Sequence, residues 1–195
     1  CGALYSNGDV IYTKETPTRR LSLIVLGLML SGCATMQAGS PQATAELKNA
    51  RGEAIGTAGL WEDANGVRLA VRVRGISPGK HGLHIHAAGK CDPSDFTTAG
   101  GHFNPGGKKH GLMSPAGPHA GDLPNLEVGA DGTGRLEYLT KLVTLAAGPT
   151  SLFDADGRAL VVHANPDDDT TDPTGNSGGR IACGVITKPA GSRSY

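Results

Sequence analysis

Three of the seven histidines in this chain fall within six positions, in the stretch HGLHIH that runs from His81 to His86. Alternating apolar and polar residues precede the stretch, and Ser77-Pro78-Gly79 is typical of a turn, so we expect its histidines on a short β-strand. On a strand, His84 and His86 point to the same face with Cα atoms about 6.5–7 Å apart, while His81 faces the other way. Two imidazoles at that separation can bind one metal ion.

The other four histidines lie in or beside long segments rich in glycine and proline, and one carboxylate, Asp122, follows His119 by three positions. None of the seven lies in the first 80 residues or after His163, so they are clustered rather than scattered over a surface. Imidazoles with a carboxylate suit zinc, and imidazoles alone suit copper or zinc. We therefore predict two metal sites that share the first long loop, with candidate ligands His102, His110, His119, Asp122 and His163.

Short strands must position these side chains. The chain has 30 glycines, 12 prolines and 4% aromatic residues, which favours strands and turns over a helical bundle. The apolar pattern predicts strands at 43–48, 54–61, 67–73, 83–86, 126–128, 135–139, 159–163 and 181–186. Two stretches without periodicity, 87–124 and 166–179, predict functional loops. The expected fold class is all-β, an eight-stranded antiparallel Greek-key barrel or sandwich with two long functional loops.

The charge of the chain is balanced. It has 18 basic and 18 acidic residues, a formal net charge of zero, and no long block of one sign. A protein that binds nucleic acid carries a basic patch or stripe, so we expect no nucleic-acid partner.

The N-terminal part has the pattern of an export signal. Arg19-Arg20 precede an apolar run at 21–30 that is shorter than the roughly 20 residues needed to span a bilayer. The LSGC that ends at Cys33 resembles a bacterial lipobox, in which the cysteine is lipidated. We expect a leader at 1–32, with a translation start that differs from Cys1, then a tether at 33–42 and one domain at 43–195. The protein is then exported and periplasmic, and lipid-anchored to a membrane, the outer membrane if the host is Gram-negative.

The cysteines fit an exported protein. Cleavage before Cys33 leaves that residue with Cys91 and Cys183 in the mature chain. If Cys33 carries lipid, two cysteines remain in an oxidising compartment, where disulfides form and persist. We therefore predict a disulfide between Cys91 and Cys183.

Six motifs occur in an order and spacing that resemble the copper/zinc superoxide dismutases: GKHGLHIH, GGHFNP, KKHG, HAGDLPN, LVVHA and GNSGGRIACGVI. The resemblance covers 43–188, and the leader and the short interval from His86 to Cys91 are similar to the bacterial, exported branch. It implies an enzyme that converts superoxide into oxygen and hydrogen peroxide, with one copper and one zinc per chain, in antioxidant defence outside the cytoplasm.

The resemblance implies a role for each candidate residue. Copper would be held by His84, His86, His102 and His163, and zinc by His102, His110, His119 and Asp122, with His102 bridging the two. Asp167 matches the aspartate that links a copper histidine to a zinc histidine, and His81 matches a structural histidine. Arg180 matches the arginine that attracts the substrate anion, so Arg180 and His102 are the expected catalytic residues. Cys91 and Cys183 match the family disulfide.

One departure and one alternative stay open. Pro173 stands where animal enzymes have a channel lysine, so Lys90, Lys108 and Lys109 are the candidates for steering the substrate. The alternative function is a non-enzymatic copper- or zinc-binding lipoprotein on the same fold. Such relatives usually lose a ligand or the arginine, whereas every ligand position and Arg180 are intact here. A homodimer is compatible with the resemblance, because bacterial relatives include monomers and dimers, and the N-terminal lipid is the expected membrane contact.

Overall fold

The computed structural model describes residues 39–189. The chain divides into two compact units, Cys1–Ala38 and Gly39–Tyr195, and the second contains all of these residues. The predicted leader and the predicted lipidation site at Cys33 lie outside the described residues. Residues 39–189 contain no helix that is both long enough and apolar enough to cross a membrane.

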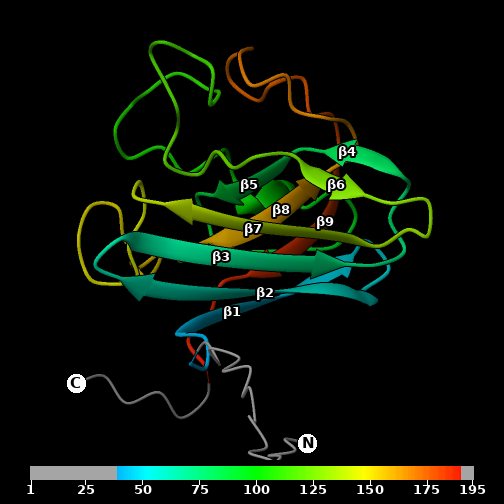
Figure 1. Cartoon of the computed structure of the whole chain (residues 1–195), viewed down its shortest axis with the longest axis horizontal. Coiled ribbons are helices and arrows are strands. Elements are labelled where there is room, and N and C mark those ends of the chain that lie inside the picture. The colour runs from blue at the N-terminus through cyan, green and yellow to red at the C-terminus, as the bar shows by residue number, and fades with distance from the viewer. Residues whose placement is uncertain (1–38, 190–195) are drawn as a thin grey trace, which may run out of the picture. The chain divides into compact units, whose positions relative to one another are not determined.

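Nine strands form one sheet in the described part of the second unit (Figure 1). They are β1 (Ala43–Asn49), β2 (Ala54–Asp63), β3 (Gly66–Val73), β4 (Gly79–His81), β5 (Leu83–His86), β6 (Leu126–Val128), β7 (Gly134–Thr140), β8 (Ala159–His163) and β9 (Arg180–Val185), with a 3-10 helix, η1, at Thr97–Ala99. Their order in the sheet is β4-β6-β7-β3-β2-β1-β9-β8-β5, and all neighbouring strands are antiparallel. The predicted all-β antiparallel fold is confirmed.

The sheet nearly closes on itself. Its two edge strands, β4 and β5, follow each other in the chain and are separated only by Gly82. β3 is followed by β4, which lies beyond β7 and β6, so the connection skips two strands as Greek-key connections do. The expected turn at 77–79 was partly wrong, because Gly79 begins β4 and pairs with Val128 of β6. A three-residue strand is too short to show alternation, which is why eight strands were expected instead of nine.

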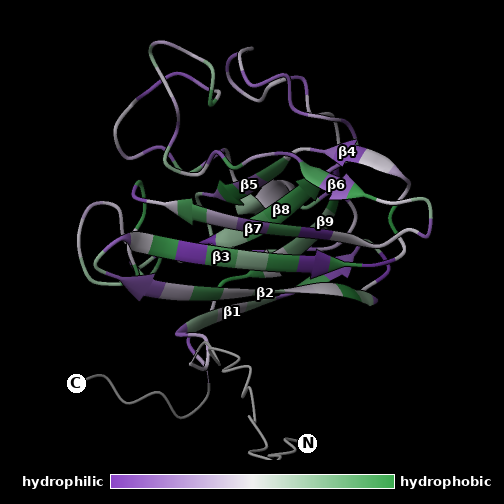
Figure 2. Cartoon of the chain, in the orientation of Figure 1, coloured by the Kyte–Doolittle hydropathy of each residue, from purple (hydrophilic) through white to green (hydrophobic). Residues whose placement is uncertain are grey.

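The barrel interior is apolar because alternate residues of the strands point inward. In β3, Val67, Leu69 and Val71 are buried, and Arg72 between the last two buried positions of the strand is exposed. Figure 2 shows this alternation of apolar and polar residues along β3. Burial of such side chains, each worth about 1.5–3 kcal/mol, supplies the main stabilisation of the barrel.

The outer face of β5 and β8 is buried as well, and this is the feature that creates the site. Leu83 and Ile85 of β5 join the barrel core, which leaves His84 and His86 on the outer face. A second apolar cluster covers this face beside β8, and its members are Phe96, Ala99, Ala159, Val161 and Cys183. The first loop carries Phe96 and Ala99, and it is tied to β9 by the disulfide between Cys91 and Cys183. The predicted disulfide is confirmed.

Candidate metal centre

The first loop is paired with the free edge of β5. Two isolated β-bridges join them, His84 with Asp122 and His86 with His102. Between these bridges, the N–H of Ile85 donates to the carbonyl oxygen of Gly121 at 2.8 Å. A glycine is needed there because a Cβ would lie 2.2 Å from the carbonyl oxygen of Ile85. The loop therefore adds to the sheet as a strand would, and this pairing brings its ligand-type side chains beside those of β5.

A β-bulge places the third part of the site. β8 and β9 pair with a register shift between Val162 and His163, after which His163 lies opposite Arg180. Bulges re-aim side chains and are common beside active sites. The shift sets an imidazole and a guanidinium next to each other at the end of two paired strands.

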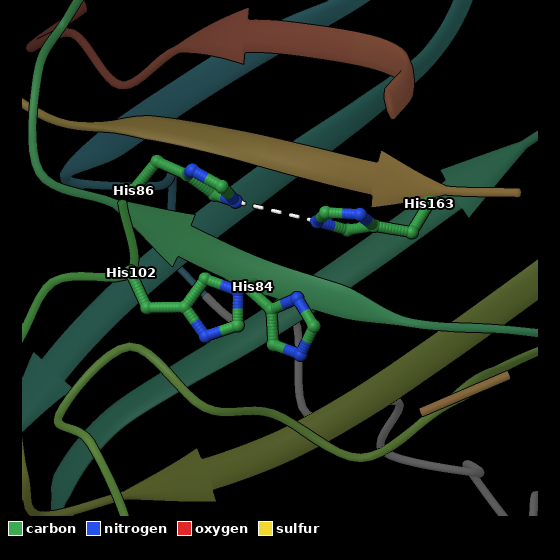
Figure 3. A group of neighbouring side chains, drawn as sticks. All are labelled: His84, His86, His102 and His163. Atoms are coloured by element: carbon green, nitrogen blue, oxygen red, sulfur yellow. Dashed lines mark hydrogen bonds between the residues drawn. The ribbon is translucent and has the colours of Figure 1, made fainter. Parts of the chain in front are cut away.

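Four histidines from three segments converge at this point, and we call them the four-histidine cluster: His84, His86, His102 and His163 (Figure 3). One ring nitrogen of each lies within 4.8 Å of those of the others, and all four side chains are buried. Figure 3 shows the rings of His86 and His163 pointing at each other, with Nε2 atoms 3.3 Å apart.

In the rings of His86 and His163, the N–H group is on Nδ1, the nitrogen that points away from the other ring. His86 Nδ1 donates to the carbonyl oxygen of Gly100 at 2.8 Å, and His163 Nδ1 donates to that of Gly178 at 3.1 Å. A neutral imidazole has one donor and one acceptor nitrogen, so both Nε2 atoms are acceptors and cannot satisfy each other. His84 Nδ1 and His102 Nε2 are buried without a hydrogen-bond partner in the described residues. Lone pairs from four buried nitrogens thus face one small space, which suits a soft or borderline metal cation.

A second group surrounds one carboxylate oxygen, and we call it the Asp122 cluster: His102, His110, His119 and Asp122. Oδ1 of Asp122 lies 3.0, 3.1 and 3.3 Å from Nδ1 of His102, His110 and His119 respectively. Oδ2 of Asp122 accepts the backbone N–H groups of Gly111 and His119, at 2.8 and 2.9 Å, and is thereby fixed. Three nitrogens and one oxygen are the donor set and number that zinc prefers.

His84 also lies within 4.8 Å of three members of the Asp122 cluster. Its Nε2, however, is bonded to Asp167 Oδ2 at 2.5 Å, and its other nitrogen belongs to the four-histidine cluster. His119 is therefore the better fourth member, because its Nδ1 is buried with no hydrogen-bond partner among the described residues.

Asp167 connects the two clusters. Its Oδ2 accepts from His84 Nε2 and its Oδ1 accepts from His110 Nε2 at 3.0 Å. The backbone of Asp167 is held by Asn125, which accepts its N–H at 2.8 Å and donates to its carbonyl at 2.9 Å. A carboxylate in this place fixes the tautomer and orientation of both rings.

Arg180 lies beside the four-histidine cluster. Its Nη1 donates to the carbonyl oxygen of Phe96 at 2.5 Å, and its Nη2 donates to that of Gly100 at 2.6 Å. The Gly100 carbonyl is shared with His86 Nδ1. Arg180 is thus held by the first loop, close enough for its charge to act on two members of the cluster.

Burial keeps three histidines of the four-histidine cluster neutral at pH 7. It lowers the pKa of His84 to about 3, that of His86 to about 2 and that of His163 to about 4. The positive charge of Arg180 contributes to the low pKa of His86 and His163. Neutral imidazole is the form that binds a metal, so these rings are ready to do so.

The carboxylates have the opposite role. Burial acts to raise the pKa of Asp122 and of Asp167, but hydrogen bonds from the neighbouring imidazoles hold both well below their usual range. Burial acts to lower the pKa of His110, but its bonds to both carboxylates raise it to about 10. Both carboxylates are therefore ionised, and they supply the negative charge that a divalent cation needs.

Every candidate residue of the two predicted ligand sets lies in one of the two clusters. His81 lies outside them, with Nδ1 2.8 Å from the carbonyl oxygen of His163. Of the predicted steering lysines, Lys109 pairs with Asp172 at 3.0 Å, which offsets its charge. The carbonyl oxygens of Gly100 and Gly178 could not be identified from the sequence, because backbone acceptors leave no trace in residue type. The role of Asn125 was not predicted either, although the motif HAGDLPN contains this residue.

Comparisons with known proteins agree with this geometry. The sequence model of the family described as copper/zinc superoxide dismutase matches residues 54–186. Cu-Zn superoxide dismutase 2 of Aquifex aeolicus is 46% identical over 170 residues, which cover 86% of this chain and 99% of the relative. Cu-Zn superoxide dismutase of Deinococcus radiodurans is 42% identical over 179 residues, 84% of this chain and 93% of the relative.

Solved structures show the same fold. A SOD-like protein from Bacillus subtilis has a TM-score of 0.70 at 41% identity, over 73% of this chain and 96% of that one. Cu/Zn superoxide dismutase from Brucella abortus has a TM-score of 0.62 at 30% identity, over 74% of this chain and 99% of that one. By sequence match and by fold, this chain belongs to the copper/zinc superoxide dismutase family.

Proposed function

We propose that this protein converts two superoxide anions into oxygen and hydrogen peroxide, with copper in the four-histidine cluster and zinc in the Asp122 cluster. The observation that carries the proposal is the set of four buried acceptor nitrogens in the first cluster, which no donor among the described residues satisfies. When bound, copper supplies the one-electron redox change and zinc supplies a fixed positive charge without redox chemistry.

The protein's own residues bind the substrate and handle a proton. The Arg180 guanidinium keeps its charge at any working pH and attracts a small anion to the copper side. His102 belongs to both clusters, with Nδ1 at the Asp122 cluster and Nε2 at the four-histidine cluster. His102 Nε2 can therefore bind a metal or hold a proton without movement of the rest of the loop.

Metal analysis with a superoxide assay tests this proposal. The mature protein should bind one copper and one zinc, and it should lose superoxide dismutation when copper is removed. His102→Ala should weaken both metals, whereas His119→Ala should mainly empty the zinc site. A single metal site after full reconstitution would refute the two-metal assignment. Metal binding without dismutase activity would favour the alternative, a non-enzymatic metal-binding lipoprotein.

We further propose that the protein acts in the periplasm as a lipoprotein anchored through Cys33. Support comes from the apolar run at 21–30 and the LSGC that follows it. Stable membrane anchoring takes two acyl signals, because one chain gives only marginal binding. A cysteine that carries two acyl chains meets this requirement. Mass spectrometry of the native N-terminus should find acylated Cys33, and an unmodified cysteine there would overturn this part. A homodimer is compatible with the proposal.

A further inference from the structure

Arg158 is a buried arginine that lies next to the first residue of β8. The residue is 5% exposed, and two of its side-chain nitrogens donate hydrogen bonds. Nη1 donates to the carbonyl oxygens of Ala87 and Gly157, at 2.9 and 2.5 Å, and Nη2 donates to the carboxylate of Asp154. Its Nε is buried with no hydrogen-bond partner in the described residues. A charge in such a place is costly, so its contacts call for an explanation.

Two of the contacts of Arg158 fall on residues that directly follow cluster histidines. Ala87, whose carbonyl it binds, follows His86, and Phe103, whose ring lies under the guanidinium, follows His102. The guanidinium carbon is 4.1 Å from the centroid of the Phe103 ring. A guanidinium over an aromatic face is attracted to it by about 0.5–2 kcal/mol.

These two residues lie on paired segments. His86 and His102 form a β-bridge, and the N–H of Ala87 donates to the carbonyl oxygen of Gly101 at 2.9 Å. Arg158 comes from a third segment and holds both sides of this pair at once. It is anchored in turn by Asp154, so the guanidinium has little freedom to follow a shift of the loop.

We propose that Arg158 is a positioning residue of the copper site, which sets the separation of His86 and His102 through the residues that follow them. This inference rests on the proposed function, because it assumes copper in the four-histidine cluster. This role explains why a charged side chain is buried here, because an apolar side chain of similar volume could fill the same space if packing were its only role.

The effect should fall mainly on copper. His86 belongs to the four-histidine cluster alone, and in the described residues the Arg158 side chain contacts Ala87, Asp154, Gly157 and Phe103 but not His110, His119 or Asp122. We therefore expect those three side chains to keep their positions when Arg158 is changed. Zinc should therefore be weakened less than copper.

The test compares Arg158→Met with a matched control, Glu62→Gln. Glu62 also ties a distant loop to a strand. Its carboxylate accepts hydrogen bonds from Thr144 Oγ1 and from the N–H groups of Leu145 and Ala146, the last two at 3.0 and 3.1 Å. None of its partners adjoins either cluster. The full mature protein is reconstituted, and copper and zinc affinities are measured by chelator competition, with the copper(II) electron paramagnetic resonance spectrum of each variant.

Arg158→Met should lower copper affinity by about 10-fold to 100-fold, the usual effect of a residue that supports a ligand, and should alter the copper(II) spectrum. Glu62→Gln should lower thermal stability but leave the spectrum and both affinities as in the parent. Arg158→Lys, which keeps the charge but not the planar fork, should fold and give an intermediate loss of copper affinity. If both Arg158 variants kept the parent's spectrum and copper affinity, or lost copper and zinc equally, Arg158 would be structural only. A parent that binds no copper in the four-histidine cluster would instead refute the proposed function.

Discussion

Removal of the carboxylate at Asp167 is the most direct test of how the two clusters are coupled. Three N–H groups converge on this carboxylate: His84 Nε2 on Oδ2, and His110 Nε2 and the Asp169 backbone on Oδ1. In Asp167→Asn, one of the two oxygens becomes an NH₂ group, which can only donate. Whichever way the amide is turned, at least one imidazole N–H then faces another donor.

The size of the effect follows from burial. Leaving a buried donor unsatisfied costs about 1–3 kcal/mol, and each 1.4 kcal/mol is a factor of ten in affinity. An imidazole can escape this cost by moving its proton to the other nitrogen, but that nitrogen is the one that faces the metal. We therefore expect Asp167→Asn to lower the affinity for at least one metal by about 10-fold to 100-fold. Asp167→Ala should lower both, because both imidazoles lose their acceptor.

Gly175→Ala reaches the same carboxylate without removing it. Gly175 has φ +61°, and a Cβ there would lie 1.8 Å from Asp167 Oδ1 and 2.6 Å from His110 Nε2. The carboxylate must then move, so metal affinity should fall as in Asp167→Asn. The matched control is Asp168→Asn, because the Asp168 carboxylate accepts from Thr170, Thr171 and Asn176 and from neither cluster. Chelator competition for each metal is the assay, and parent-like affinities for both metals in Asp167→Ala would refute the coupling.

Three further predictions concern charge, the disulfide and pH. Arg180→Glu should leave both metals bound but lower the catalytic rate by about 10-fold to 1,000-fold and flatten its salt dependence. The rate is measured by stopped flow. Full activity with the parent's salt response would show that Arg180 does not capture substrate. Replacing Cys91 and Cys183 by serine opens a loop with a sequence separation of 92, which should lower the free energy of unfolding by about 4–5 kcal/mol, and an unchanged urea midpoint would contradict this. In the metal-free protein, the lowered pKa values of three members of the four-histidine cluster, His84, His86 and His163, make stability fall as the pH drops below about 6.5, because the unfolded chain then binds more protons. The pKa of His110 is raised to about 10, so stability should fall as the pH rises from about 6.5 towards 10. The melting temperature measured in chelator should therefore be highest near pH 6.5. A melting temperature that rises steadily through pH 6.5 would contradict this.

Strands with clear alternation could be predicted from the sequence, and short or irregular ones could not. β3 shows four buried valines and leucines at every second position, and its predicted range differs from the observed one by a single residue. β4 has three residues, of which Gly79 has φ 128°, a value that turns usually need. Local propensity favours a turn there, and only pairing with a distant segment, β6, makes it a strand.

The membership of the metal site was predictable to a greater degree than its geometry. Histidine is uncommon and chemically distinct, so clustering and family motifs identify the imidazoles that gather in the structure. The groups that orient them are different in kind. The carbonyl oxygens of Gly100 and Gly178 act through the backbone, and Arg158 acts through contacts with neighbours of the ligands, so neither can be read from spacing.

The placement of the clusters depends on the cover that the first long loop provides. Histidines on the outer face of a barrel would ordinarily be solvated, and their lone pairs would be satisfied by water. Here the first loop adds to the edge of β5 and brings an apolar cover with it, so that His84 and His86 are 0% and 1% exposed. Burial lowers their pKa and removes competing water, but it also leaves acceptor nitrogens unsatisfied, a cost that a bound cation offsets. Metal binding should therefore stabilise the folded loops as well as supply the chemistry, because the unfolded chain has no such site.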